Sequence, residues 1–185
     1  MAFAYFMVGQ AAVTRNNAQT AADAAALAAA QDARDQLRKG WLDVALEPER
    51  WEVFLQGRRY VESSACERAA VFASKNGAQL EDGDCVRFRG RYEGFSLTVS
   101  TAGGEGGKAT ASAKAVIKPN CAFGVPGASE SEAGSSSPGP VETGEESETV
   151  VGLSCGGVPW VIDPDHPELP NAADLFIVRL VGDDE

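Results

Sequence analysis

The chain opens with a long stretch of apolar and small residues that contains few helix breakers. Residues 1–13, MAFAYFMVGQAAV, carry no charge, and residues 14–38 are rich in Ala, Leu, Gln and Arg, which favour helix. The only Gly is Gly9, and there is no Pro. The pattern predicts one helix over residues 1–38, roughly 55 Å long, which Gly40 ends. A helix of this length is longer than a small domain is wide, so one of its ends must lie outside the domain.

A second, shorter helix is predicted within residues 42–57. Pro48 suits its first turn, because a first-turn residue needs no backbone N–H partner. Trp51, Phe54 and Leu55 then recur at spacings of three and four, which places them on one helical face. This aromatic stripe is expected in the core rather than around a cofactor.

A third helix is predicted from about Ser64 onward, in the segment SACERAAVFASK. Ser63 or Ser64 can cap its first turn, and Glu67 can complete a capping box. The pair Asn76-Gly77 supplies a stop signal, because both residues tolerate the left-handed conformation that ends helices.

After residue 77 the apolar residues follow the two-residue period of a half-buried strand. Phe95, Leu97 and Val99 are the clearest example, and the GGEGG segment at residues 103–107 suits a turn between two strands. The fold class is therefore α+β, with the long helix and short helices packed on a small antiparallel sheet. The predicted strands lie in residues 83–90, 94–102 and 108–119, and two later segments, 150–163 and 173–182, are expected to return to the same sheet.

One segment has the composition of a disordered loop. Residues 126–149 hold six Glu, no Lys or Arg and no aromatic residue, so they cannot bury enough apolar surface to offset their ordering entropy. The expected organisation is a helix over residues 1–38, one domain over residues 39–125, this acidic loop, and strands of the same domain in residues 150–185.

The four cysteines favour disulfides over a metal site. Their spacing is too wide for a CxxC motif, and an even count suits an oxidising compartment. A structural zinc site of thiolates is the weaker alternative. Three connectivities are possible, and the favoured one is sequential, since it would clamp the ends of the acidic loop and tie the third helix to the first strand. The cysteines are Cys66, Cys85, Cys121 and Cys155.

Charge and motifs exclude several functions. The formal net charge is −11, so nucleic acid is a poor partner. The chain lacks the phosphate-binding glycine motifs, the GxSxG elbow and the HExxH motif, and its one histidine is His166, so no enzyme and no cofactor is expected. Asp82 and Asp84 flank Gly83 in a segment expected to be a polar turn; a weak calcium site is the alternative there.

The long helix carries two further patterns. Small residues recur every fourth position, which lets a neighbouring helix approach closely. Arg15, Gln19 and Asp23 follow the same spacing and could form a polar ladder, either as a solvated stripe or as a contact to a partner subunit. The expected packing positions are Ala18, Ala22, Ala26 and Ala30, with a second row at Ala21, Ala25, Ala29 and Ala33.

The apolar residues 1–13 are too few to span a bilayer and lack the basic start of a signal peptide. They are interpreted as the outer end of a transmembrane helix whose inner half lies upstream. The alternative is an amphipathic helix that folds onto its own core. An apolar continuation behind a basic flank would support the anchor.

The segment from Arg15 to Ala28 resembles the Ala-rich helix of TadE/TadG-like proteins, the minor-pilin-like components of the tight-adherence (Flp) pilus assembly system. The resemblance covers about the first 35 residues. It implies a single-pass membrane protein with an extracytoplasmic α+β domain, whose partners are other pilus-assembly or pilin-like membrane helices. The matching residues are Arg15, Gln19, Ala21, Ala22, Asp23, Ala24, Ala25, Ala26, Leu27 and Ala28.

Processed pilins of this system carry a glutamate shortly after their cleavage site, whereas nothing acidic precedes Asp23 here. Either upstream residues hold it or the protein is an unprocessed TadG-like anchor, which is the favoured interpretation. The expected function is a non-enzymatic structural role in pilus assembly. The alternative is a surface-tethered module that binds an extracellular ligand.

Overall fold

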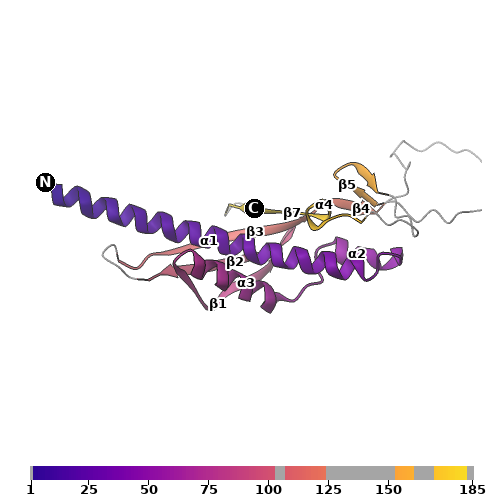
Figure 1. Ribbon diagram of the computed structural model, residues 1–185, viewed down its shortest axis with the longest axis horizontal. Helices are drawn as coiled ribbons and strands as arrows, with labels where there is room; N and C mark the ends of the chain where they lie inside the picture. Colours follow the sequence, from indigo (N-terminus) through magenta and orange to yellow (C-terminus); the bar gives the residue numbers. More distant parts are fainter. Residues whose placement is uncertain (1, 103–106, 124–152, 161–168, 183–185) are drawn as a thin grey trace, which may run out of the picture.

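Helix α1 extends along most of the molecule and beyond one end of the sheet (Figure 1). The computed structural model describes residues 2–102, 107–123, 153–160 and 169–182. The observed class is α+β, as predicted. The helices are α1 (Ala2–Leu42), the 3₁₀ turn η1 (Pro48–Arg50), α2 (Trp51–Leu55), α3 (Glu62–Lys75) and α4 (Ala172–Leu175). The strands are β1 (Ala78–Arg89), β2 (Glu93–Thr101), β3 (Thr110–Pro119), β4 (Cys121–Phe123), β5 (Leu153–Cys155), β6 (Val158–Trp160) and β7 (Phe176–Val181).

The main sheet has four antiparallel strands in the order β1-β2-β3-β7. Phe95, Leu97 and Val99 of β2 are buried together with the small residues of α1 and α3, so both helices cover the same face of the sheet. Residues with odd numbers along β2 therefore form the core face, as the alternation predicted. The even-numbered Ser96 and Thr98 lie on the opposite face, which no described helix covers.

Small residues bring α3 close to α1. Ala65, Ala69 and Ala73 recur every fourth position on α3 and are fully buried. Close approach of two helices is possible because these side chains add little bulk between the backbones. The two helices therefore pack as one layer over the sheet.

The start of α3 differs from the prediction of a serine cap. The helix begins at Glu62, with Val61 as N-cap and no side-chain capping bond. Gln36 of α1 binds the N-cap residue itself: its Oε1 accepts from the Val61 N–H at 2.8 Å and its Nε2 donates to the Val61 carbonyl. Ser64 instead donates to Asp32 Oδ2 at 3.0 Å. A contact from a distant helix has replaced a local capping box.

The predicted stop at Gly40 is wrong, because α1 continues to Leu42. Gly40 allows the Phe54 ring to approach the backbone of α1 closely, because a Cβ atom at this position would lie 2.4 Å from Cε1 of Phe54. Phe54 belongs to the predicted stripe, and its partners Trp51 and Leu55 are buried with it. The stripe is core, as predicted, and it packs on the glycine.

The C-terminal segments divide between two sheets. Strand β7 joins the main sheet beside β3, as predicted. Strands β5 and β6 do not; they pair with β4 in a separate three-stranded sheet. The pairing of β4 with β5 joins the two ends of residues 124–152. The predicted acidic loop 126–149, most of the GGEGG segment and His166 lie outside the described residues.

Two disulfides hold these parts together. Cys66 of α3 is bonded to Cys85 of β1, and Cys121 of β4 is bonded to Cys155 of β5. This is the sequential connectivity that the sequence favoured. The first bond ties α3 to an edge strand, and the second joins directly paired residues of the small sheet.

Candidate functional site

Helix α1 has two halves in different surroundings. Val13 is 59% exposed, whereas Ala18 and the other alanines of the two predicted rows are fully buried. The apolar N-terminal part therefore extends away from the domain, and the Ala-rich part belongs to its core (Figure 1). The change occurs within the polar sequence TRNNAQT at residues 14–20.

Both predicted rows of small residues make their contacts within this chain. The neighbours that approach these rows closely are α3 and the sheet of the same domain, so the rows are already occupied by this chain. The alternative of a helix folded onto its own core concerns residues 1–13, and it does not describe Val13, which is 59% exposed. The eight residues, each with zero exposure, are Ala18, Ala21, Ala22, Ala25, Ala26, Ala29, Ala30 and Ala33.

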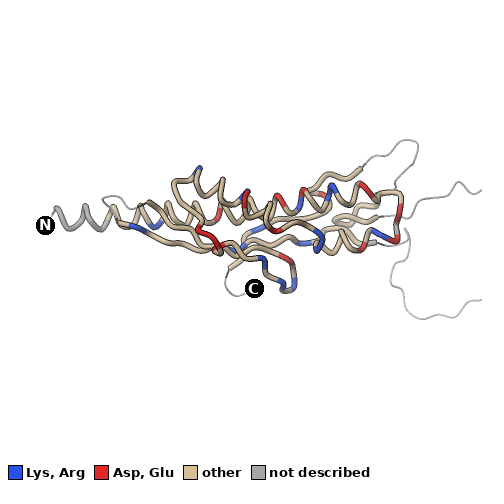
Figure 2. Tube along the Cα trace, turned by 90° about the horizontal axis from the view of Figure 1, so that it is seen from below, with Lys and Arg blue, Asp and Glu red and all other residues tan. Residues whose placement is uncertain are grey.

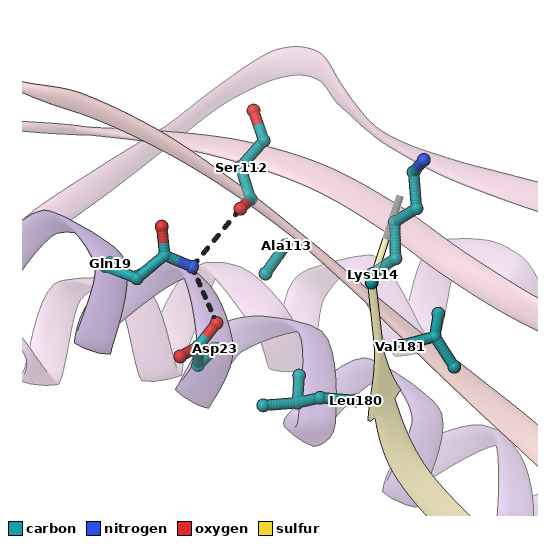
Figure 3. Close-up of a pocket in the computed structure, with 8 residues that line it drawn as sticks. Gln19, Asp23, Ser112, Ala113, Lys114, Leu180 and Val181 are labelled. Carbon is teal, nitrogen blue, oxygen red and sulfur yellow. Dashed lines mark hydrogen bonds between the residues drawn. The ribbon is translucent and has the colours of Figure 1, made fainter. Parts of the chain in front are cut away.

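The predicted polar ladder is formed in part. The side-chain amide of Gln19 donates to Asp23 Oδ1 at 2.8 Å and to the backbone carbonyl of Ser112 at 3.3 Å (Figure 3). Helix α1 is thereby connected to strand β3 at the point where the helix leaves the domain. Arg15 is exposed one turn closer to the N-terminus and makes none of these contacts.

This point is also a notch in the surface. Strand β7 ends at Val181, opposite Lys114, so β3 continues past it with one edge that no other described strand pairs with. Gln19 bonds to that edge at Ser112, as a strand neighbour would. The resulting pocket has a volume of about 260 Å³. Its lining comprises Gln19, Asp23, Ser112, Ala113, Lys114, Leu180, Val181 and Gly182.

Sequence reasoning identified Gln19 and Asp23 but missed the residues of β3 and β7 around them. No local pattern could have identified Ser112 or Leu180, because they reach the notch only through the strand order. Lys114 lines the same pocket, with its ammonium group directed away from Asp23 (Figure 3).

Arg15 and Asp23 lack ion-pair partners within the described part of the chain. The ion pairs found there involve other residues, and no described carboxylate lies within 4 Å of Arg15. Among the described residues, the notch therefore presents the carboxylate of Asp23 beside the Lys114 side chain, and the projecting helix presents the guanidinium of Arg15.

A second, shallow cleft lies at the opposite end of the sheet, beside the turn between β1 and β2. Arg58, Arg91 and Lys118 line it together with Tyr92. Its one carboxylate, Glu93, is buried and already engaged, since Arg87 Nε donates to it at 2.8 Å. The cleft is therefore positively charged and suited to anionic groups.

Charge on the described part of the molecule is nearly balanced. The described residues hold sixteen Lys and Arg and fourteen Asp and Glu, and both signs are distributed along the body (Figure 2). The acidic excess of the whole chain lies in the segments that are not described.

The possible calcium position has a different local structure from the one expected. Asp82 and Asp84 lie within β1, where the register with β2 shifts between Leu80 and Cys85, rather than in a turn before the strand. In the described part of the chain, no three His, Cys, Asp or Glu side chains are grouped in a way that could hold a metal ion.

None of the described helices contains a run that is both long and apolar enough to cross a bilayer.

Residues 1–32 match the family of Flp pilus-assembly TadE/G-like proteins. The matched range contains the projecting part of α1, the polar residues 14–20 and the first buried turns. The resemblance inferred from Arg15 to Ala28 is thereby confirmed for this segment, and it supports a role connected with pili. No curated protein and no solved structure matches the chain.

Proposed function

We propose that this protein is a non-enzymatic structural subunit of a Tad/Flp-type pilus assembly system in the cell envelope. This proposal rests mainly on the two different surroundings of α1. Its apolar N-terminal part projects from the domain, while its Ala-rich part is buried in it. An exposed apolar helix end is unfavourable in water, so it is expected to lie in a membrane or among other helices. The family match covers this same part of the chain.

In this proposal the N-terminal part of α1 anchors the protein as part of a single membrane pass. The polar residues 14–20 then lie at the water interface, and the domain lies outside the cytoplasm. Two disulfides in a domain of this size fit an oxidising compartment. The partners are other pilus-assembly or pilin-like helices, which contact the projecting part because the alanine rows are already occupied.

The test is a charge placed on the projecting helix in the bacterium that carries the gene. Val13→Glu should remove pilus assembly and reduce co-purification with other pilus components, because a carboxylate is costly in an apolar contact. Val71→Glu is the matched control, since Val71 is a similarly exposed valine, 45%, on α3 of the domain. It should leave assembly unchanged.

The alternative function, a tethered module that binds an extracellular ligand, predicts a different result. In that case Val13→Glu would leave pili intact, and the protein would be found without pilus components. Normal pilus assembly in the Val13→Glu strain, at normal protein levels, would refute the proposed function.

A further inference from the structure

Arg15 and Asp23 are opposite charges on α1, about 80° apart around the helix, and neither has an ion-pair partner in the described structure. They are eight residues apart, which corresponds to about 12 Å along the helix axis. Arg15 stands on the projecting part, where it is exposed. Asp23 stands at the edge of the domain, in the notch beside β3.

The notch holds the Asp23 carboxylate in a defined position. Its Oδ1 accepts from Gln19, which is itself bonded to Ser112, so the side chain is oriented by the sheet. Its Oδ2 has no hydrogen bond among the described residues. A planar guanidinium that enters the notch could donate to this oxygen, and charge-assisted pairs of this kind are among the stronger hydrogen bonds.

We infer that Arg15 of one copy pairs with Asp23 of a second copy, with their α1 helices parallel and shifted by about 12 Å. This inference rests on the proposed function, in which the apolar ends of both helices enter the same membrane or bundle and must point the same way. Parallel helices without a shift would place Arg15 beside Arg15, and like charges repel. The shift replaces that repulsion with an attraction.

Such a contact does not close on itself. After one pair has formed, the first copy still offers its Arg15 and the second copy still offers its Asp23. A head-to-tail contact of this type extends into a row of subunits rather than a closed dimer. The two charges would therefore set the spacing between successive copies.

Charge reversal tests the pairing in cells. Arg15→Glu and Asp23→Arg should each lower the amount of assembled protein on the order of tenfold, because each leaves like charges facing each other. The double variant should recover most of the assembly, because it restores opposite charges. Asp23→Asn keeps an acceptor for Gln19 and removes the charge, so it should also lower assembly while the purified protein melts at the same temperature.

Cross-linking tests the geometry. The native cysteines are paired in disulfides, so a short bis-maleimide reacts with introduced thiols alone. The full-length Ala12→Cys/Thr20→Cys protein keeps Arg15 and Asp23, and its two thiols lie at exposed positions with the same eight-residue spacing. In membranes it should yield a ladder of dimers, trimers and larger species. Asn17→Cys/Thr20→Cys is the control, because Asn17 is exposed but points about 140° away from Ala12 around the helix. It should yield little product.

The outcomes separate the inference from the function on which it rests. A closed dimer without larger species would indicate an antiparallel twofold contact and overturn the shifted arrangement. Failure of the double reversal to recover assembly, or normal assembly in both single reversals, would overturn the pairing. If the reversals have no effect while Val13→Glu abolishes assembly, the proposed function stands and the inference fails. If Val13→Glu also has no effect, both fail.

Discussion

Replacing Gly40 by Ala measures how closely α1 and α2 pack. In a helix interior, alanine is favoured over glycine by about 1 kcal/mol, so helix propensity alone predicts stabilisation. The structure opposes that gain, because the new Cβ would lie 2.4 Å from Cε1 of Phe54. Carbon atoms approach each other to roughly 3.5 Å, so the ring would have to move by about 1 Å.

The ring has little room to move. Phe54 is only 8% exposed, and the Arg59 guanidinium lies 5.6 Å from its ring centroid. Forcing extra volume into a packed core costs typically about 1–3 kcal/mol. With the propensity gain subtracted, Gly40→Ala should lower the free energy of unfolding by about 0–2 kcal/mol.

A double-mutant cycle with Phe54→Leu isolates the steric term. In the Phe54→Leu background the shorter side chain leaves space, so Gly40→Ala should stabilise, and the coupling energy should be about 1–3 kcal/mol. Unfolding in urea, followed by circular dichroism, supplies the four free energies. Gly9→Ala is the control, because a Cβ there meets nothing within 4 Å. Equal stabilisation by Gly40→Ala in both backgrounds would refute the argument.

Two further predictions concern stability. Burial raises the pKa of Tyr60 above its usual value near 10, and its hydroxyl has no hydrogen-bond partner in the described part of the chain. The folded protein therefore keeps a proton that the unfolded chain releases, so stability should fall as pH rises above about 10, and Tyr60→Phe should flatten that fall without loss at pH 7. Urea titrations between pH 7 and 11 check this, and equal slopes for both proteins would contradict it. Cys66→Ala/Cys85→Ala should cost about 3 kcal/mol in the chain-entropy model, since it releases a closed loop of nineteen residues. An unchanged urea midpoint would show that this disulfide does not constrain the unfolded chain.

Several elements were predictable because their signals are local. The uninterrupted helix formers of α1, the stripe of Trp51, Phe54 and Leu55, and the alternation in β2 each reflect a period that the backbone itself imposes. The stop signal at Asn76-Gly77 is of the same kind, and α3 does end at Lys75. The resemblance to the pilus-assembly family is also carried by one continuous segment, within residues 1–32.

Other features depended on contacts between distant residues. Gly40 carries a normal stop signal, but α1 continues to Leu42, and the lack of a side chain at Gly40 leaves room for the Phe54 ring. Ser64 carries a normal capping signal, but α3 begins at Glu62, Gln36 of α1 binds Val61, and Ser64 donates to Asp32 of α1. In both cases a tertiary contact outweighed a local preference of about 1 kcal/mol.

Local signals in the amino-acid sequence are enough to predict the long helix, its polar segment at residues 14–20, the α+β class and the resemblance to a pilus-assembly family. Only the tertiary structure decided what the alanine rows contact, because small residues allow close approach to any neighbour and do not say which one. It also decided that Asp23 lies in a notch where β7 ends before β3 does. Spacing along one helix shows which side chains share a face, whereas the partner of that face depends on how the rest of the chain folds back.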